Sequence, residues 1–200
     1  MAEFKVNPDN VREFRDEKAL EAWYTKQSGK ADELWIKLHK KGSGLASVTN
    51  LEALDVALCW GWIDAIRKSF DDKSFLQRYT PRTKTSIWSK KNIDNVERLI
   101  AAGRMTERGQ SEIDKAKADG RWARAYGAGA KLETHPDLLK AIKAEPKAQA
   151  MYDKLSAQNR FALAFRVHNL KTEAARARRI VQFVEMLKRG ETIYPNGKAK

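Results

Sequence analysis

The residues best suited to binding an anion occur in one continuous segment, residues 73–93. This segment contains no Asp or Glu, and aromatic residues are interleaved with its cations. The cations are Lys73, Arg78, Arg82, Lys84, Lys90 and Lys91, and the aromatic residues are Phe75, Tyr79 and Trp88. Cations beside exposed aromatic rings are typical of surfaces that contact phosphate and stack on bases. Serine and threonine hydroxyls in the same segment add neutral donors for an anion.

The same composition has a purely structural explanation, which we favour when this segment is taken alone. Aromatic side chains usually pack into the core, and lysines and arginines are mostly solvated. In that case the segment is the edge of a hairpin and a connecting loop, and its charge does not define a ligand.

A second group of chemically capable residues precedes this segment, at Trp60-Gly61-Trp62-Ile63-Asp64. Asp64 is the acid best placed to serve a site, because it could accept a hydrogen bond from Arg78 or from a ligand hydroxyl. Proton transfer by Asp64 is the catalytic alternative. We favour a structural ion pair for this carboxylate.

The remaining candidates do not predict a metal, redox or nucleotide-loop site. His39, His135 and His168 are not spaced as ligand pairs, and Cys59 has no cysteine partner. Cys59 follows Leu58 on an apolar helix face, so we favour a buried structural thiol over a nucleophile. No glycine-rich phosphate loop is recognisable, and we expect neither a cofactor nor a metal.

Composition indicates a folded and strongly basic protein. The 200 residues are 42% apolar and 32% charged, with a net charge of +13 and a pI near 9.8. Residues 101–200 hold most of the excess, with 21 Lys and Arg against 11 Asp and Glu. Such a field attracts nucleic acid, anionic lipid or acidic metabolites, but it does not define the fold.

The sequence also leads us to expect a cytoplasmic protein that does not insert into membranes. The first twenty residues lack the apolar region of a secretory signal, and no later run is long and apolar enough to span a membrane. A single cysteine rules out an internal disulfide, which fits a reducing compartment.

Local signals in the first half predict a mixture of helix and strand. Asp16 caps a helix through Lys26, and residues 34–39 alternate as a half-buried strand. Thr49 and Glu52 form a capping box for a helix that Gly61 ends. Residues 62–69 and 74–80 read as an antiparallel hairpin around the polar turn 70–73, with Pro81 closing the second strand.

Helical signals dominate from residue 90 onward. Thr106, Ser156 and Thr172 are N-caps, His135-Pro136-Asp137 begins a short helix, and Pro146 interrupts it. Weak periodicity and two glycines make residues 123–135 the best candidate linker. We expect the last residues, 194–200, to fray.

These elements together predict an α+β fold that is predominantly helical. A small antiparallel sheet lies in the N-terminal half and is followed by an all-helical C-terminal half. The predicted regions are 1–128, which carries the basic Trp-rich hairpin, and 129–200, and they either pack as one unit or stand apart.

The central motifs resemble the YdeI/OmpD-associated proteins of bacteria. The resemblance is carried by residues 59–64, by Arg78 with Thr80-Pro81-Arg82, by Ser86-Ile87-Trp88-Ser89 with Asn92, and by Ala102-Gly103-Arg104-Met105. Residues 116–122, Asn159-Arg160 and residues 176–180 also fit, so the resemblance covers roughly residues 15–195. Ala65 stands where many relatives have glycine.

The resemblance implies a bacterial cytoplasmic protein with a bacteriocin-protection label. It supplies no established reaction and no catalytic residues that can be carried over to this chain.

The leading hypothesis is a non-enzymatic binding or stress-protection protein that recognises an anionic ligand, such as nucleic acid or a nucleotide, through a basic aromatic surface. The predicted ligand-binding residues are Trp62, Asp64, Arg78, Arg82, Lys84, Ser86, Trp88 and Lys90. In this hypothesis the cations bind charge, and Trp62 and Trp88 stack on the ligand.

Two other classes of function stay open. One is an enzyme that acts on a small phosphorylated or acidic substrate, with Asp64 as its acid or base. The other is a scaffold for protein interactions, which a large exposed apolar patch would indicate.

Overall fold

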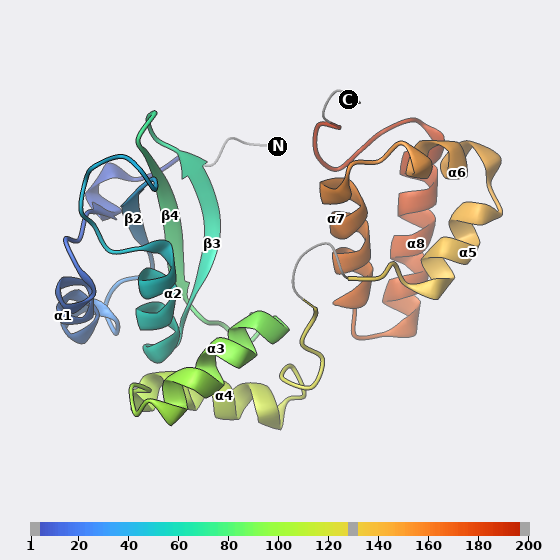
Figure 1. Ribbon diagram of the computed structural model, residues 1–200. Coiled ribbons are helices and arrows are strands. Elements are labelled where there is room, and N and C mark those ends of the chain that lie inside the picture. The colour runs from blue at the N-terminus through green and yellow to red at the C-terminus, as the bar shows by residue number, and fades with distance from the viewer. Residues whose placement is uncertain (1–4, 128–131, 197–200) are drawn as a thin grey trace. The chain divides into compact units, whose positions relative to one another are not determined.

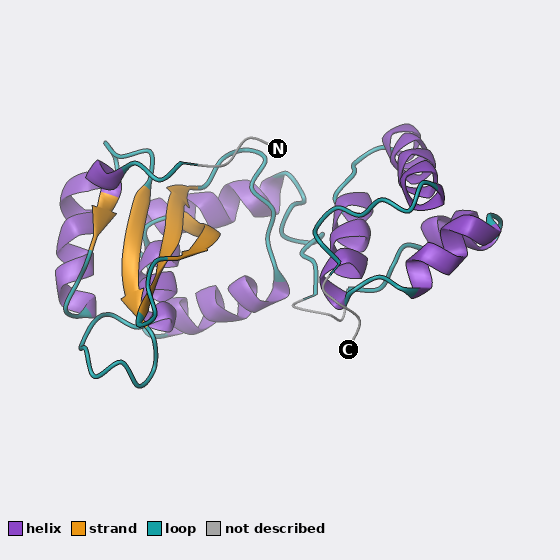
Figure 2. Cartoon of the chain, turned by 90° about the horizontal axis from the view of Figure 1, so that it is seen from above, coloured by secondary structure: helices purple, strands orange, loops and turns teal. Residues whose placement is uncertain are grey.

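The computed structural model describes residues 5–127 and 132–196 and shows an α+β fold, which confirms the predicted class. Within these residues there are eight α-helices, about 49% helix, and one four-stranded sheet (Figure 1). The chain divides into two compact units. The N-terminal unit comprises residues 1–88 and 92–124, and the C-terminal unit comprises residues 89–91 and 125–200. All strands in the described part of the chain lie in the N-terminal unit (Figure 2).

The sheet has the strand order β1-β2-β4-β3. Its hairpin, β3 (Trp62–Ser69) and β4 (Ser74–Pro81), is antiparallel and has the predicted bounds to within a residue. β2 (Leu34–His39) also pairs antiparallel with β4. The sheet is nevertheless mixed rather than purely antiparallel, because the two-residue β1 (Val11–Arg12) runs parallel to β2. A two-residue strand is too short to show a period-two pattern.

β2 is more deeply buried than its alternating sequence predicted. Leu34, Ile36 and Leu38 face one side, as expected, and all three are buried. Trp35 lies on the opposite face but is also buried. The prediction of a half-buried strand was therefore wrong at this position, since alternation shows which residues share a face but not what covers that face.

Two helices with predicted caps lie against the sheet (Figure 1). α1 (Glu17–Gln27) begins where the Asp16 carboxylate accepts from the Ala19 N–H at 2.8 Å, and α2 (Asn50–Cys59) begins with the Thr49 and Glu52 capping box. The buried Tyr24 ring of α1 meets the Trp62 ring of β3 edge to face, with centroids 5.2 Å apart. Both caps are confirmed.

α3 (Lys90–Ala101) and α4 (Glu107–Ala118) follow the sheet in the chain. The start of α4 is fixed against the end of α2. The Cys59 carbonyl accepts hydrogen bonds from the Thr106 hydroxyl at 2.6 Å and from the Thr106 N–H at 3.3 Å. A methyl group at Gly109 would overlap both this carbonyl and the Met105 sulfur. Only glycine permits this approach of the two helices.

The C-terminal unit contains four helices packed around one apolar core. They are α5 (Pro136–Lys143), α6 (Pro146–Asp153), α7 (Ala157–His168) and α8 (Glu173–Lys188). The core includes Leu138, Ile142, Leu163, Val167 and Leu187. α7 and α8 begin at the predicted caps, although α7 ends at His168 rather than near Lys171.

The predicted interruption at Pro146 is confirmed, because α5 ends at Lys143 and Pro146 occupies the first position of α6, where its missing N–H costs nothing. The expectation that the last residues fray was wrong at two positions. Tyr194 and Asn196 do not fray, because the buried Asn159 side chain bonds to both residues. Residues 197–200, and residues 128–131 of the predicted linker, lie outside the described residues.

Replacing Gly109 with alanine should destabilise the N-terminal unit. Alanine normally stabilises a helix interior by about 1 kcal/mol relative to glycine, but the overlap with Cys59 should reverse the sign and cost about 1–3 kcal/mol. Chemical denaturation of wild type and Gly109→Ala measures this difference.

Gly127→Ala is the control for Gly109→Ala, because no heavy atom lies within 4 Å of its added methyl position. An unchanged or increased stability of Gly109→Ala would show that the two helices do not approach as closely as described.

Candidate functional site

Arg82 and Trp88, both predicted to bind ligand, contact each other. The Arg82 guanidinium lies over the Trp88 ring, 3.5 Å from its centroid, and donates to the Ile87 carbonyl at 3.2 Å. Arg82 is 7% exposed and Trp88 is 2% exposed. The cation therefore occupies the ring face that was expected to stack on a ligand.

Arg121 holds the same loop from α4's C-terminal side and was not among the predicted site residues. Its guanidinium, 6% exposed, donates to the carbonyls of Ser86 at 2.9 Å and Thr83 at 3.3 Å. Asp119 accepts from Arg121 at 2.7 Å. The only sequence signal for Arg121 was its place in residues 116–122, which fit the family resemblance.

A pocket of about 310 Å³ lies beside this loop and against α4. Two predicted residues, Trp62 and Arg82, contribute to its lining. The other lining residues are Ser28, Trp60, Gly61, Pro81, Glu107, Arg108, Ser111, Glu112 and Lys115. Trp62 is only 1% exposed and packs against Tyr24, so its ring belongs to the core rather than to the surface.

The pocket contains an exposed guanidinium, Arg108, which sequence reasoning missed. Arg108 forms no ion pair or side-chain hydrogen bond with any residue that the structure describes. Its guanidinium lies over Gly29, where an added methyl carbon would come within 2.6 Å of a guanidinium nitrogen. The side chain therefore rests on backbone, with its hydrogen-bond donors available.

The other charges in the pocket nearly balance each other. Lys115 pairs with Glu112 at 2.7 Å, and Glu107 adds a second carboxylate. Together with Arg82 and Arg108, these groups leave a formal excess of one positive charge. An anion with additional donor groups would complement this arrangement.

Asp64 and Arg78, which the sequence suggested as a pair, lie on opposite faces of the hairpin. Asp64 is exposed on β3 and lies opposite Tyr79, whereas Arg78 points to the other face of β4. Arg78 donates to Glu33 at 2.7 Å. Burial raises the pKa of Tyr79 well above its usual range, and the negative charge of Asp64 adds a smaller increase.

The Glu33 carboxylate that pairs with Arg78 is electrostatically stabilised. Burial by itself raises the pKa of Glu33, but hydrogen bonds from Asn10 and Arg78, together with the Arg78 charge, outweigh it. The pKa of Glu33 is therefore lowered, and the charged form is favoured in the folded protein.

The remaining predicted residues lie in the loop after β4 and at the start of α3. The Ser86 hydroxyl accepts from the Thr83 N–H at 2.9 Å and so closes a turn. Lys84 is exposed and has no ion pair within the described residues. Lys90 is also exposed, but its N–H donates to the Tyr126 carbonyl, and residues 89–91 cluster with the C-terminal unit.

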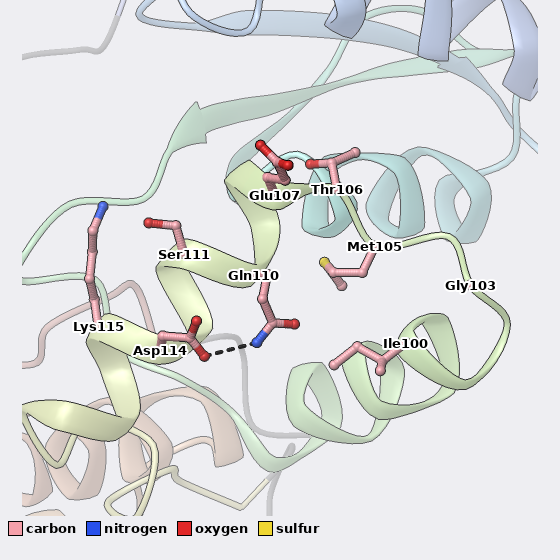
Figure 3. Close-up of a pocket in the computed structure, with 9 residues that line it drawn as sticks. All are labelled: Ile100, Gly103, Met105, Thr106, Glu107, Gln110, Ser111, Asp114 and Lys115. Atoms are coloured by element: carbon pink, nitrogen blue, oxygen red, sulfur yellow. Dashed lines mark hydrogen bonds between the residues drawn. The ribbon is translucent and has the colours of Figure 1, made fainter.

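A second cavity of about 640 Å³ lies between α3 and α4 (Figure 3). Ile100 and Met105 give it an apolar wall, and the Gln110 amide donates to Asp114 at 2.8 Å. None of the predicted site residues lines it.

Cys59 is buried, as predicted for a structural thiol. Burial raises the pKa of Cys59 to about 11, which opposes formation of the reactive thiolate. In residues 5–127 and 132–196, no cluster of three or more His, Cys, Asp or Glu could hold a metal ion. In the same ranges, no helix combines the length and apolar character that a membrane crossing requires.

Two family models match the chain over separate ranges. The first, described as "Domain of unknown function (DUF8412)", matches residues 12–112, which is half of the chain. The chain belongs to the DUF8412 family. The second, described as "Bacteriocin-protection, YdeI or OmpD-Associated", matches residues 131–190. Neither a curated protein nor a solved structure matches significantly.

The two matches correspond to different parts of the molecule. The DUF8412 match lies in the N-terminal unit apart from residues 89–91, and the second match lies in the C-terminal unit. The YdeI/OmpD-associated resemblance is confirmed over residues 131–190, and it fits a non-enzymatic protein of the stress-protection type. The motifs at residues 59–105 that first suggested it fall within the DUF8412 range.

Cys59 should react very slowly with a soluble disulfide reagent at pH 8. The raised pKa and the burial of the thiol should make labelling about a hundredfold or more slower than in unfolded protein. The absorbance change with Ellman's reagent measures both rates, and glutathione serves as the exposed-thiol control. Equal rates for folded and unfolded protein would contradict a buried thiol.

Replacing Glu33 with glutamine should lower stability at neutral pH but not at acid pH. A lowered pKa in the folded state contributes stability above the unfolded pKa and loses it as pH falls through the folded pKa. We expect a loss on the order of 1–2 kcal/mol at pH 7, which shrinks as pH falls below about 4.5. Denaturation across pH measures it.

Glu97→Gln is the matched control for Glu33→Gln, because Glu97 is exposed and forms no ion pair within the described residues. A Glu33→Gln deficit that stays constant from pH 7 to pH 3 would show that the lowered pKa is not its cause.

Proposed function

We propose that the protein is a non-enzymatic binding protein of the stress-protection type and that its N-terminal unit recognises a small anionic ligand in the pocket beside α4. The observation that carries this proposal is the exposed, unpaired guanidinium of Arg108 at that pocket. A guanidinium in this state offers a planar set of donors that matches a carboxylate or a phosphate.

The aromatic residues act beneath the site rather than as its stacking surface. Trp88 supports Arg82, which lines the pocket, and Trp62 anchors β3 against α1. Of the predicted cations this site keeps Arg82, and it adds Arg108, while ring stacking is assigned to the protein's own residues. Lys84 remains a solvated cation that a longer anion could contact.

The pocket volume favours a ligand of nucleotide size or smaller. Its 310 Å³ lies at the lower end of the range for small-molecule sites, about 300–1,000 Å³. Asp64 does not line the pocket, so the geometry gives no support to the alternative in which Asp64 is the acid or base of an enzyme. Binding without turnover is therefore the function that the residues lining the pocket support.

Arg108→Ala should weaken binding of adenosine monophosphate by roughly tenfold or more, because a hydrogen bond to a charged group contributes about 1.5–3 kcal/mol. Trp60 is partly exposed and lines the pocket, so a fluorescence titration reports occupancy. Adenosine, which lacks the phosphate, should bind wild type more weakly than the monophosphate does.

Arg178→Ala is the matched control, because Arg178 is exposed on α8 and its replacement also removes one positive charge. Its affinity for the monophosphate should equal that of wild type. Equal losses in both variants would mean that net charge, rather than the pocket, attracts the ligand. Absence of saturable binding by wild type to adenosine monophosphate and to single-stranded oligonucleotide would contradict anion recognition at this pocket.

A further inference from the structure

A cavity of about 850 Å³ lies within the C-terminal unit and is separate from the pocket beside α4. Residues 133–135 and the helices α5, α6 and α7 contribute to its lining. Its volume is within the range of small-molecule sites, about 300–1,000 Å³. The cavity lies in the part of the chain that matches the YdeI/OmpD-associated model.

The amphipathic pattern of α5 explains why charged residues face this cavity. Leu138 and Ile142, four residues apart, are fully buried in the core. Residues three and four apart share a helix face, so Leu139, Lys140 and Lys143 form a different face, and all three line the cavity. Pro136 fixes the start of this helix.

The cavity lining is rich in basic side chains. Lys140 and Lys143 line it together with the imidazoles of His135 and His168, whereas Glu133 is the sole carboxylate among the lining residues that the structure describes. Neither lysine forms an ion pair with a residue in the described ranges. Two solvated ammonium groups and a single carboxylate favour an anion over a cation.

One wall of the cavity is apolar and is held in place. The Tyr152 hydroxyl and the Thr134 hydroxyl are hydrogen-bonded at 2.8 Å, and Arg160 lies 5.3 Å from the centroid of the Tyr152 ring. Leu139 and Pro136 also line the cavity and add apolar surface to it. A fixed apolar wall beside cations suits a molecule with both an apolar body and a charged head group.

We propose that the C-terminal unit binds a small amphipathic anion, a phosphate or carboxylate carried on an apolar body about the size of one aromatic ring. Lys140 and Lys143 bind the charged group, and Leu139 and the Tyr152 ring pack against the apolar body. This site is independent of the anion site of the N-terminal unit, because the two pockets share no residue.

The test is a proton NMR titration of the full chain with phenyl phosphate. The sequence contains three histidines, and two of them line this cavity. The imidazole signals of His135 and His168 should shift with saturation, while those of His39, in the N-terminal unit, should not. Phenol and inorganic phosphate, which each supply one half of the probe, should bind at least about tenfold more weakly.

The variant Lys140→Ala/Lys143→Ala should weaken phenyl phosphate binding by at least about tenfold. Lys147→Ala/Lys154→Ala is the control, because both lysines are exposed, neither lines the cavity, and the change of charge is the same. Equal affinity in the two variants would overturn the proposal. Saturable binding that leaves His135 and His168 unshifted, or inorganic phosphate binding as tightly as phenyl phosphate, would also overturn it.

Discussion

The close approach of α4 to the end of α2 is the constraint on which the N-terminal unit depends. Gly109 lies against the Cys59 carbonyl, and Thr106 donates two hydrogen bonds to the same oxygen. A helix end leaves carbonyl groups without intrahelical partners, so Thr106 serves both helices: it satisfies an α2 carbonyl and caps α4. Because α4 carries Arg108 and Lys115, this junction also places the cations of the pocket.

Cations in this protein have two different uses. Arg82 and Arg121 are buried and fasten the loop after β4, one through Trp88 and the Ile87 carbonyl, the other through Asp119 and two loop carbonyls. A buried guanidinium requires such partners, since an unpaired charge in the interior is costly. Arg108 and Lys84 lie at the surface, where their donors are available to a ligand. High positive charge in the sequence does not distinguish the two uses.

Most of the fold was predictable because its signals are local. The caps at Asp16, Thr49, Thr106, Ser156 and Thr172 each involve residues three apart, and the hairpin turn lies between two β-compatible runs. β1 was missed because a strand of two residues is too short to show such a signal.

The site was less predictable because it depends on tertiary placement. Residue type could not show that Trp62 and Trp88 are buried. Nor could it show that Arg78 donates to Glu33, or that the Arg108 guanidinium lies over Gly29. These facts depend on which segments become neighbours after folding.

The central claim is that the aromatic residues organise the basic loop internally while Arg108 meets the ligand. A crystal structure of the full chain grown with adenosine monophosphate tests it most directly. We expect the phosphate on the Arg108 guanidinium, with Arg82 still stacked on Trp88. An adenine ring stacked on Trp88 or Trp62, with Arg82 displaced and Arg108 unoccupied, would contradict it.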